Sequence, residues 1–182
     1  MSIVSDYFKF IQRLDGNVYY AEVKPLGKTL HVSMPDNVAI KVMDGVQVQE
    51  IVDEVNILKK QHDIERSIKY YGCYVELSRV YIVMEYLEGH VLYTVLRHIM
   101  LKEIMNFKPS GIDRLFLVRE IAKAIQELHN RDIVHQDITL HNVIIQDDLS
   151  VKLINLVGST LISSDPYVIH GDLASMKLAD WW

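Results

Sequence analysis

Four side chains in this sequence are of the types that could position a hydroxyl group and hold a metal-bound nucleotide. Asp137 follows His135 in the pattern H-x-D, Asn142 lies five residues after Asp137, and Asn155 lies thirteen residues after Asn142. This spacing places a carboxylate, an amide and a second oxygen ligand at fixed offsets, the layout of a loop that serves phosphoryl transfer. Upstream, Lys41 ends an apolar run and could neutralise phosphate oxygens.

The segment 46–60 is expected to be a helix that presents a glutamate to Lys41. Its apolar residues at the helical spacing i, i+4 and i+7 are Ile51, Val55 and Leu58. Glu54 borders that apolar face. A carboxylate at the edge of a core-facing stripe needs a cationic partner, and Lys41 in the preceding strand is the candidate. Taken alone, Glu54 would be better interpreted as a glutamate exposed to solvent, and Lys41 in the preceding strand strengthens the paired interpretation.

Predicted strands flank this helix on both sides. Residues 7–43 are rich in strand-forming side chains, with runs at 19–23 and 38–42 separated by turns that contain Pro and Gly. Residues 68–76 and the apolar run 80–84 predict two further strands. The sequence then becomes abruptly polar at 85–89, which is the expected hinge between two lobes.

Helices are expected to dominate the remainder. Residues 90–107 form one predicted helix, and 112–129 form a second, longer one. The apolar stripe of the longer helix comprises Leu115, Val118, Ile121, Ala122, Ile125 and Leu128. Short strands are predicted at 143–145 and 151–154.

These elements predict an α+β fold of two lobes. The first lobe, over residues 1–87, is rich in strands. The second, over 90–182, is helical and contains the loop 135–142 that carries Asp137 and Asn142.

Composition excludes several classes of function. The 182 residues are enough for a sizeable core, and the net charge of −5 leaves no basic surplus for nucleic acid. The single cysteine, Cys73, cannot form an internal disulfide and gives no structural zinc site. The sequence has no signal-peptide pattern and no long apolar run. We therefore expect an intracellular protein, cytoplasmic or nuclear, without a membrane partner.

Several motifs occur together in one order: the run Val38-Ala39-Ile40-Lys41, the segment Val83–Leu87, and the H-x-D-x-x-x-x-N loop that ends at Asn142. Over residues 10–160 the chain resembles the eukaryotic-type protein kinases, and the serine/threonine branch in particular. The resemblance implies a two-lobed kinase fold with a β-rich first lobe and an incomplete helical second lobe.

The resemblance also implies roles for individual residues. Lys41 would contact the nucleotide phosphates and Glu54 would pair with Lys41. Asp137 would be the catalytic carboxylate, while Asn142 and Asn155 would hold Mg²⁺ or Mn²⁺ together with ATP. Contacts with the adenine base would come from Val23, Ala39, Ile144 and the hinge residues Met84, Glu85 and Leu87.

Four departures from the family pattern predict impaired catalysis. The glycine-rich loop keeps only Gly16, because Val18 and Ala21 occupy the other two glycine positions. Asn155 stands where the family has a metal-binding aspartate, and a neutral amide is a weaker ligand for Mg²⁺. In addition, Thr139 replaces a lysine and Gln136 replaces an arginine of the family loop.

The fourth departure is a C-terminal truncation, because no A-P-E segment follows Asn155. Either Asp172 or Asp180 could begin the last helix. The apolar face of the helix at 112–129 would then be exposed and could support a dimer or a complex. Ser159, Thr160, Ser163, Ser164 and Tyr167 are either phosphorylation sites or ordinary residues of a polar loop.

Three functional hypotheses remain open. The first is a kinase-like nucleotide-binding domain that is catalytically impaired and acts as a pseudokinase regulator or scaffold through a protein partner. The second is an active serine/threonine kinase that phosphorylates a protein substrate. The third is a kinase-like phosphotransferase for small molecules, which the hinge and the Lys41 motif disfavour.

Overall fold

The computed structural model describes residues 3–31, 33–45, 48–101, 114–156 and 159–161. The chain divides into two units, one comprising Met1–Lys59 and Lys69–Leu87 and the other comprising Lys60–Ile68 and Glu88–Trp182. The second unit therefore includes Lys60–Ile68, a segment that the sequence pattern placed in the β-rich lobe. Among the described residues, no helix is long and apolar enough to cross a membrane.

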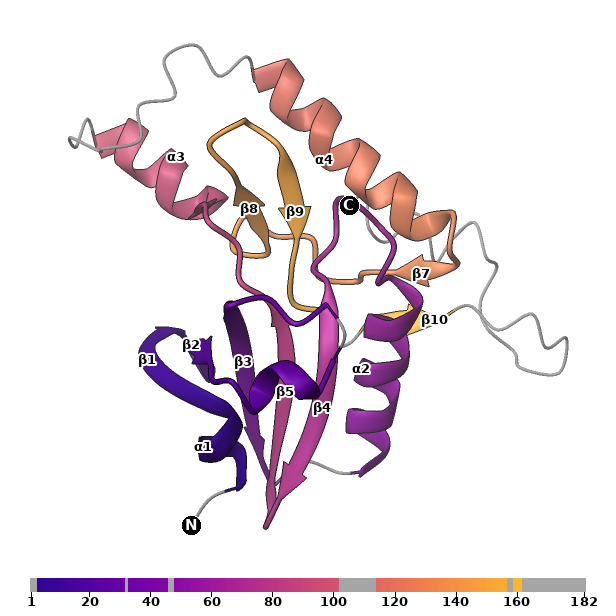
Figure 1. Cartoon of the computed structure of the whole chain (residues 1–182). Helices are drawn as coiled ribbons and strands as arrows, with labels where there is room; N and C mark the ends of the chain where they lie inside the picture. Colours follow the sequence, from indigo (N-terminus) through magenta and orange to yellow (C-terminus); the bar gives the residue numbers. More distant parts are fainter. Residues whose placement is uncertain (1–2, 32, 46–47, 102–113, 157–158, 162–182) are drawn as a thin grey trace, which may run out of the picture. The chain divides into compact units, whose positions relative to one another are not determined.

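A five-stranded antiparallel sheet forms the centre of the first unit (Figure 1). In spatial order its strands are β1 (Phe8–Asp15), β2 (Val18–Val23), β3 (Asn37–Asp44), β5 (Arg79–Glu85) and β4 (Tyr70–Glu76). Successive side chains of a strand point to opposite faces. Val38 and Ile40 therefore lie on one face of β3, and Ala39 and Lys41 lie on the other.

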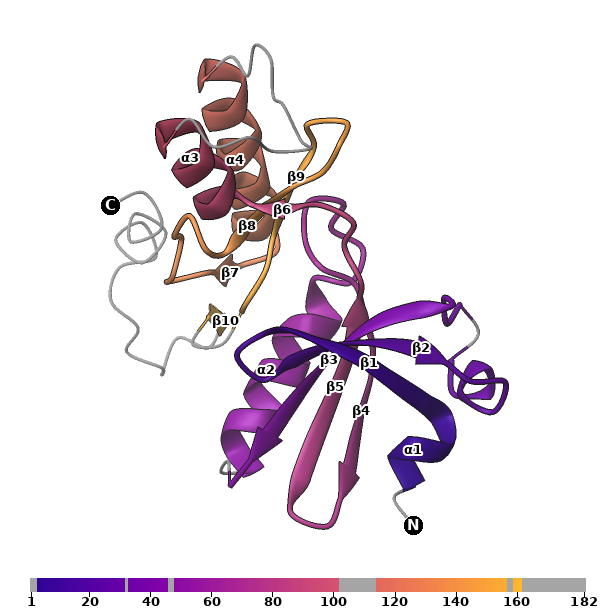
Figure 2. The same ribbon diagram turned by 90° about the vertical axis from the view of Figure 1, so that its left-hand side faces the viewer.

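The face that bears Val38 and Ile40 is covered by the N-terminal part of the chain, which includes α1 (Ile3–Tyr7) and the 3₁₀ turn η1 (Gly27–Thr29) (Figure 2). Val4 and Phe8 are buried in one apolar cluster with both β3 residues. The backbone N–H of Lys24 donates to the Tyr7 carbonyl at 2.9 Å. Sequence periodicity does not predict α1, because five residues are too few to show a helical repeat.

The opposite face of the sheet is covered by α2 (Val48–Lys60), which agrees with the helix predicted at 46–60. Ile57 and Leu58 are buried on this helix, and Glu54 is buried beside them. Of the predicted apolar stripe, Leu58 is buried and Ile51 and Val55 are half-buried. This side of the helix brings Glu54 to Lys41.

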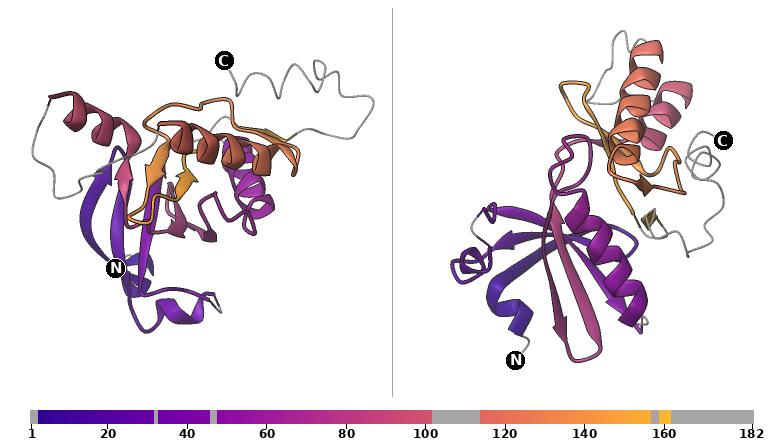
Figure 3. Two further views of the ribbon diagram at one scale, coloured as in Figure 1. Left: turned by 90° about the horizontal axis from the view of Figure 1, so that it is seen from above. Right: turned by 90° about the vertical axis from the view of Figure 1, so that its right-hand side faces the viewer.

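The described part of the second unit contains two helices and three short ladders. The helices are α3 (Leu92–Leu101) and α4 (Arg114–His129), and α4 packs on the hairpin of β8 (Val143–Ile145) and β9 (Val151–Leu153) (Figure 3). β6 (His90–Val91) pairs with β8, and β7 (Ile133–Val134) pairs with β10 (Thr160–Leu161). The predicted helix at 90–107 begins only at Leu92, because the two preceding residues pair with β8.

The apolar stripe predicted on α4 is only partly buried. Ile125 and Leu128 are buried as expected, and Leu117 and Ala124 are buried as well. In contrast, Leu115 is 77% exposed and Val118 is 63% exposed. Among the described residues, therefore, the packed face of α4 runs from Leu117 to Leu128, while Leu115 and Val118 leave apolar side chains in solvent.

An ion cluster joins the segment Lys60–Ile68 to α4. The guanidinium of Arg66 donates to Glu120 Oε2 at 3.1 and 3.2 Å and also to Glu127. Lys123 Nζ donates to Glu120 Oε1 at 2.6 Å. The hydrogen bond from Lys123, followed by that from Arg66, holds the pKa of Glu120 below its usual value, while burial acts in the opposite direction.

Candidate functional site

Lys41 and Glu54 form a buried ion pair in the first unit. Lys41 Nζ lies 2.7 Å from Glu54 Oε1, and the two side chains are 12% and 6% exposed. β3 provides the lysine and α2 provides the glutamate, as the sequence pattern predicts. The second carboxylate oxygen of Glu54, Oε2, is buried and has no hydrogen-bond partner among the described residues. The pair therefore holds the Lys41 ammonium group in one place.

Ala39 lies on the same face of the sheet as Lys41, with Met84 of β5 and Tyr20 of β2 as its cross-strand neighbours. Val23 lies on the opposite face, because β2 and β3 pair without a register shift and Val23 packs against the cluster that contains Val38. This arrangement separates two residues that the sequence pattern expected to enclose one base.

The expected hinge residues lie at the end of β5 and just beyond it. Met84 and Leu87 are both buried. Glu85 makes two hydrogen bonds with the backbone of Lys69. Its N–H donates to the Lys69 carbonyl at 2.8 Å, and its carboxylate accepts from the Lys69 N–H at 3.2 Å. The next residue, Tyr86, packs its ring against Tyr20 at a centroid distance of 4.6 Å.

The β1–β2 hairpin occupies the position expected for the glycine-rich loop. Gly16 has φ +47°, a value that suits glycine. The next residue, Asn17, ties the hairpin to β3, because its side-chain amide donates to the Val42 carbonyl at 2.7 Å and its own carbonyl accepts from the Val42 N–H at 2.9 Å. Val18 is already in β2 and pairs with Lys41. The hairpin therefore has a glycine at its turn, but not along the following strand.

In the second unit, the side chain of Asn142 is hydrogen-bonded to Asp137. Asn142 Nδ2 donates to the Asp137 carbonyl at 2.9 Å and to Asp137 Oδ2 at 2.7 Å. These two bonds fix the orientation of the amide, so its nitrogen faces Asp137 and its oxygen points elsewhere. Asp137 is exposed and Asn142 is buried. The spacing D-x-x-x-x-N thus corresponds to a real contact.

His135 is fully buried and acts as a structural support for the Asp137 loop. Its Nδ1 accepts a hydrogen bond from the Asp137 N–H at 3.3 Å, so Nδ1 carries no proton. Its Nε2 lies 3.1 Å from the Ile154 carbonyl and donates to it. Both ring nitrogens are therefore engaged with the backbone, which leaves His135 unavailable as a catalytic base.

Sequence reasoning missed the role of Ser159. Its Oγ donates to the His135 carbonyl at 3.0 Å, and the side chain is buried. Thr160, the next residue, pairs with Val134 in the β7–β10 ladder. The sequence offered Ser159 as a possible phosphorylation site, whereas in the structure its hydroxyl is used inside the unit, against the loop that carries Asp137.

Asn155 follows this loop, and the Ile154 N–H donates to the Asn142 carbonyl at 3.0 Å. Asn155 is exposed and has φ +63°, in the left-handed region that asparagine tolerates better than most residues. Asn155 is thus the second residue after the end of β9 at Leu153.

A family model described as protein tyrosine and serine/threonine kinase matches residues 14–177. The match covers most of the chain, including Lys41, Glu54, Asp137 and Asn155. The chain belongs to this kinase family.

Three curated kinases illustrate the likeness. Serine/threonine-protein kinase fray1 of Dictyostelium discoideum is 26% identical over 163 residues, which cover 80% of this chain and 27% of that protein. Misshapen-like kinase 1 of Rattus norvegicus is 28% identical over 151 residues, 77% of this chain and 10% of that protein. Serine/threonine-protein kinase Nek10 of Mus musculus is 30% identical over 151 residues, 74% of this chain and 13% of that protein. The chain thus spans less than a third of the length of these relatives.

Kinases of this family generally use ATP with a divalent metal, so the two expected metal ligands can be compared with what Mg²⁺ prefers. Asn142 and Asn155 offer neutral amide oxygens, and the carboxylate of Asp137 accepts a hydrogen bond from Asn142. Within the described ranges, no three His, Cys, Asp or Glu side chains gather as a metal site. Mg²⁺ is ordinarily held through at least one carboxylate. This donor set therefore does not fit a firmly held Mg²⁺ or Mn²⁺.

Some predicted features of the kinase chain fall outside the described residues. They are the segment 102–113, the candidate phosphorylation sites Ser163, Ser164 and Tyr167, and the candidate helix starts Asp172 and Asp180.

Proposed function

We propose that this chain is a nucleotide-binding domain of the protein kinase family with impaired phosphoryl transfer, and that it acts inside the cell as a regulator or scaffold for a protein partner. One observation carries the proposal. The cationic anchor for a nucleotide, Lys41 held by Glu54, is intact, whereas the two expected metal ligands, Asn142 and Asn155, are both neutral amides. The chain therefore keeps a binding group and lacks a group that catalysis requires.

The nucleotide contacts proposed for the first unit follow from the face that carries Lys41. Ala39 and Met84 are cross-strand neighbours on that face and would contact the base. Leu87 and the backbone beside Glu85 are the further expected contacts from the same unit. Val23 is left out of this set, because it lies on the other face of the sheet. Lys41 would attract the phosphates.

The phosphate end of this ligand would be held less firmly than in an ordinary kinase. Val18 lies in a regular strand where the family places a glycine, so its side chain restricts the close approach of backbone N–H groups to phosphate oxygens. Without an anionic metal ligand, the charge that develops on the transferred phosphoryl group would also be poorly neutralised.

A second candidate is an active serine/threonine kinase, and the bonded pair of Asp137 and Asn142 favours it. The Asp137 carboxylate is exposed and held in one orientation, so it could accept the proton of a substrate hydroxyl. The two candidates differ in turnover and not in nucleotide binding.

Thermal unfolding of the purified chain tests the proposal. The midpoint should rise with ATP, because a ligand that binds only the folded state stabilises it. Lys41→Met should remove most of this rise, whereas Lys9→Met, at an exposed lysine of β1, should leave it unchanged. If ATP raises the unfolding midpoint of neither the parent chain nor Lys9→Met, the nucleotide-binding part of the proposal is rejected. Rapid transfer of the γ-phosphate to a protein hydroxyl would reject the claim that phosphoryl transfer is impaired and would support the second candidate.

A further inference from the structure

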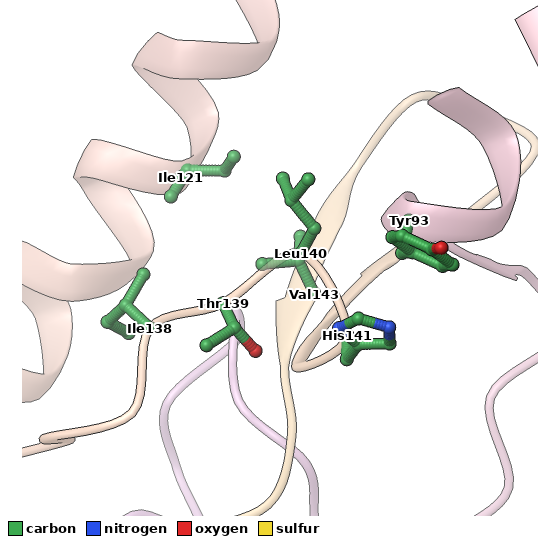
Figure 4. Close-up of a pocket in the computed structure, with 7 residues that line it drawn as sticks. All are labelled: Tyr93, Ile121, Ile138, Thr139, Leu140, His141 and Val143. Atoms are coloured by element: carbon green, nitrogen blue, oxygen red, sulfur yellow. The ribbon is translucent and has the colours of Figure 1, made fainter. Parts of the chain in front are cut away.

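An open pocket of about 480 Å³ lies in the second unit, beside the loop that carries Asp137 (Figure 4). Four aliphatic side chains line it: Ile121 of α4, Ile138 and Leu140 of the loop, and Val143 of β8. A volume of this size is in the range of binding pockets. None of these four residues has a role in the proposed nucleotide site.

The polar groups of the pocket lie in the loop and on α3. Tyr93 of α3 and His141 of the loop stack their rings at a centroid distance of 4.2 Å and an angle of 24°. Thr139 adds a hydroxyl, and none of the described residues that line the pocket carries a carboxylate or an amine. Such walls accept an apolar side chain, whereas a charged one would lose its hydration without gaining a partner.

The apolar surface continues from the pocket along α4. Val118 and Leu115 precede Ile121 by three and six residues, so they lie along one side of the helix. Both are exposed, as is Leu140 at the rim. Six residues of helix span about 9 Å. Pocket and stripe together are therefore longer than a single side chain. We call them the α4 groove, defined by Leu115, Val118, Ile121, Ile138, Leu140 and Val143, with the Tyr93–His141 pair at one side.

Two arginines lie on the helices that border the α4 groove. Arg97 follows Tyr93 by one helical turn on α3, and Arg119 follows Leu115 by one turn on α4. Both arginines are exposed, and neither has a hydrogen bond or ion pair in the described part of the chain. The carboxylate of Glu120 is buried and already bonded to Arg66 and Lys123. A partner with acidic residues would therefore complement this surface.

We propose that the α4 groove is the docking site for an amphipathic helix of a partner protein, with an apolar face that enters the pocket and acidic residues that meet Arg97 and Arg119. An amphipathic helix laid in an apolar groove places anchors at i, i+3 or i+4, and i+7, which suits a pocket that continues into an exposed stripe. The inference rests on the proposed scaffold function and specifies the partner.

Two fluorescent helical peptides of fourteen residues serve as the probe. Both carry Leu or Phe at i, i+4 and i+7. At all the remaining positions one peptide has Glu and the other has Lys. The full chain should bind the Glu peptide at least tenfold more tightly than the Lys peptide, measured by fluorescence anisotropy. Val118→Ser and Arg119→Glu should each weaken binding of the Glu peptide about tenfold. Both positions are exposed, so these variants should fold normally.

Val75→Ser is the matched control, because Val75 is 70% exposed but lies on β4 in the first unit. It should bind the Glu peptide like the parent chain. Equal affinity for the two peptides, or binding that survives Val118→Ser, overturns the proposal. So does binding that appears only after residues 162–182 are deleted, which would make that segment the occupant. A dimer that Val118→Ser dissociates would make a second copy the occupant.

Whether ATP raises the midpoint of thermal unfolding distinguishes a failure of this inference from a failure of the proposed function. If peptide binding fails while the ATP shift remains, only the docking site is wrong. If the peptide binds while the ATP shift is absent, the docking site stands and the nucleotide-binding proposal fails.

Discussion

The amide nitrogen of Asn142 donates to both the carbonyl and the carboxylate of Asp137, at 2.9 and 2.7 Å. A loop that holds its carboxylate in this way is prepared to receive a proton from a hydroxyl. We propose that Asp137 is the proton acceptor of the site and that the neutral amide of Asn155 weakens metal binding there.

The buried ion pair of Lys41 and Glu54 should matter for stability. Glu54→Ala leaves the ammonium of Lys41 buried without its partner, which typically costs about 3 kcal/mol. The exposed pair of Lys9 and Glu22 provides the comparison, because its side chains are 61% and 48% exposed. Glu22→Ala should cost less than about 1 kcal/mol. Urea unfolding measures both values, and similar losses would show that burial of the first pair is unimportant.

The hydroxyl of Ser159 should hold the loop that carries Asp137. Ser159→Ala leaves the buried His135 carbonyl without this donor, so the chain should lose about 1 kcal/mol of unfolding free energy. Amide hydrogen exchange at Val134 and His135 should accelerate as well. Ser78→Ala, in the exposed turn between β4 and β5, is the control. Unchanged exchange at Val134 would mean that the β7–β10 ladder holds without the serine.

Stability should depend on pH through Glu120. Lys123 and Arg66 lower the pKa of this carboxyl in the folded chain relative to its usual value of 4.5. The charged form is therefore favoured by folding, so the stabilisation is complete above pH 4.5 and is lost as the pH falls through the lower folded pKa.

Glu120→Gln removes the titrating group and should reduce the acid-induced loss of unfolding free energy relative to the parent chain, as measured by urea unfolding between pH 3 and pH 6. Glu88→Gln, at an exposed glutamate, should leave the acid limb of the curve nearly unchanged. An acid limb that Glu120→Gln does not alter would contradict the assigned direction of the pKa shift.

Parts of this structure could be predicted because local spacing determines them. The border position of Glu54 on an amphipathic helix favoured the ion pair only together with Lys41 in the preceding strand. The helix α2 followed from three apolar residues at helical spacing. The contact of Asp137 with Asn142 also lies within one short loop, where five residues of separation leave few arrangements.

Other parts depend on register and on contacts distant in sequence. The face on which Val23 lies is set by its pairing with β3, and shifting a strand by one residue reverses every side chain. The buried face of α4 depends on where β9 and Arg66 contact the helix, so periodicity alone included Leu115 and Val118. The bond from Ser159 to His135 joins residues 24 positions apart, and no local pattern marks it.

The most direct test of the central claim compares phosphoryl transfer by the parent chain and by Asn155→Asp, with ATP and Mg²⁺ and a protein substrate such as casein. If the amide at position 155 limits catalysis, Asn155→Asp should be faster by about 100-fold, the scale on which a single electrostatic group contributes to turnover. Addition of Asp137→Asn should abolish the gained activity. A parent chain that turns over as fast as Asn155→Asp, and equally depends on Asp137, would contradict the account and show an active kinase.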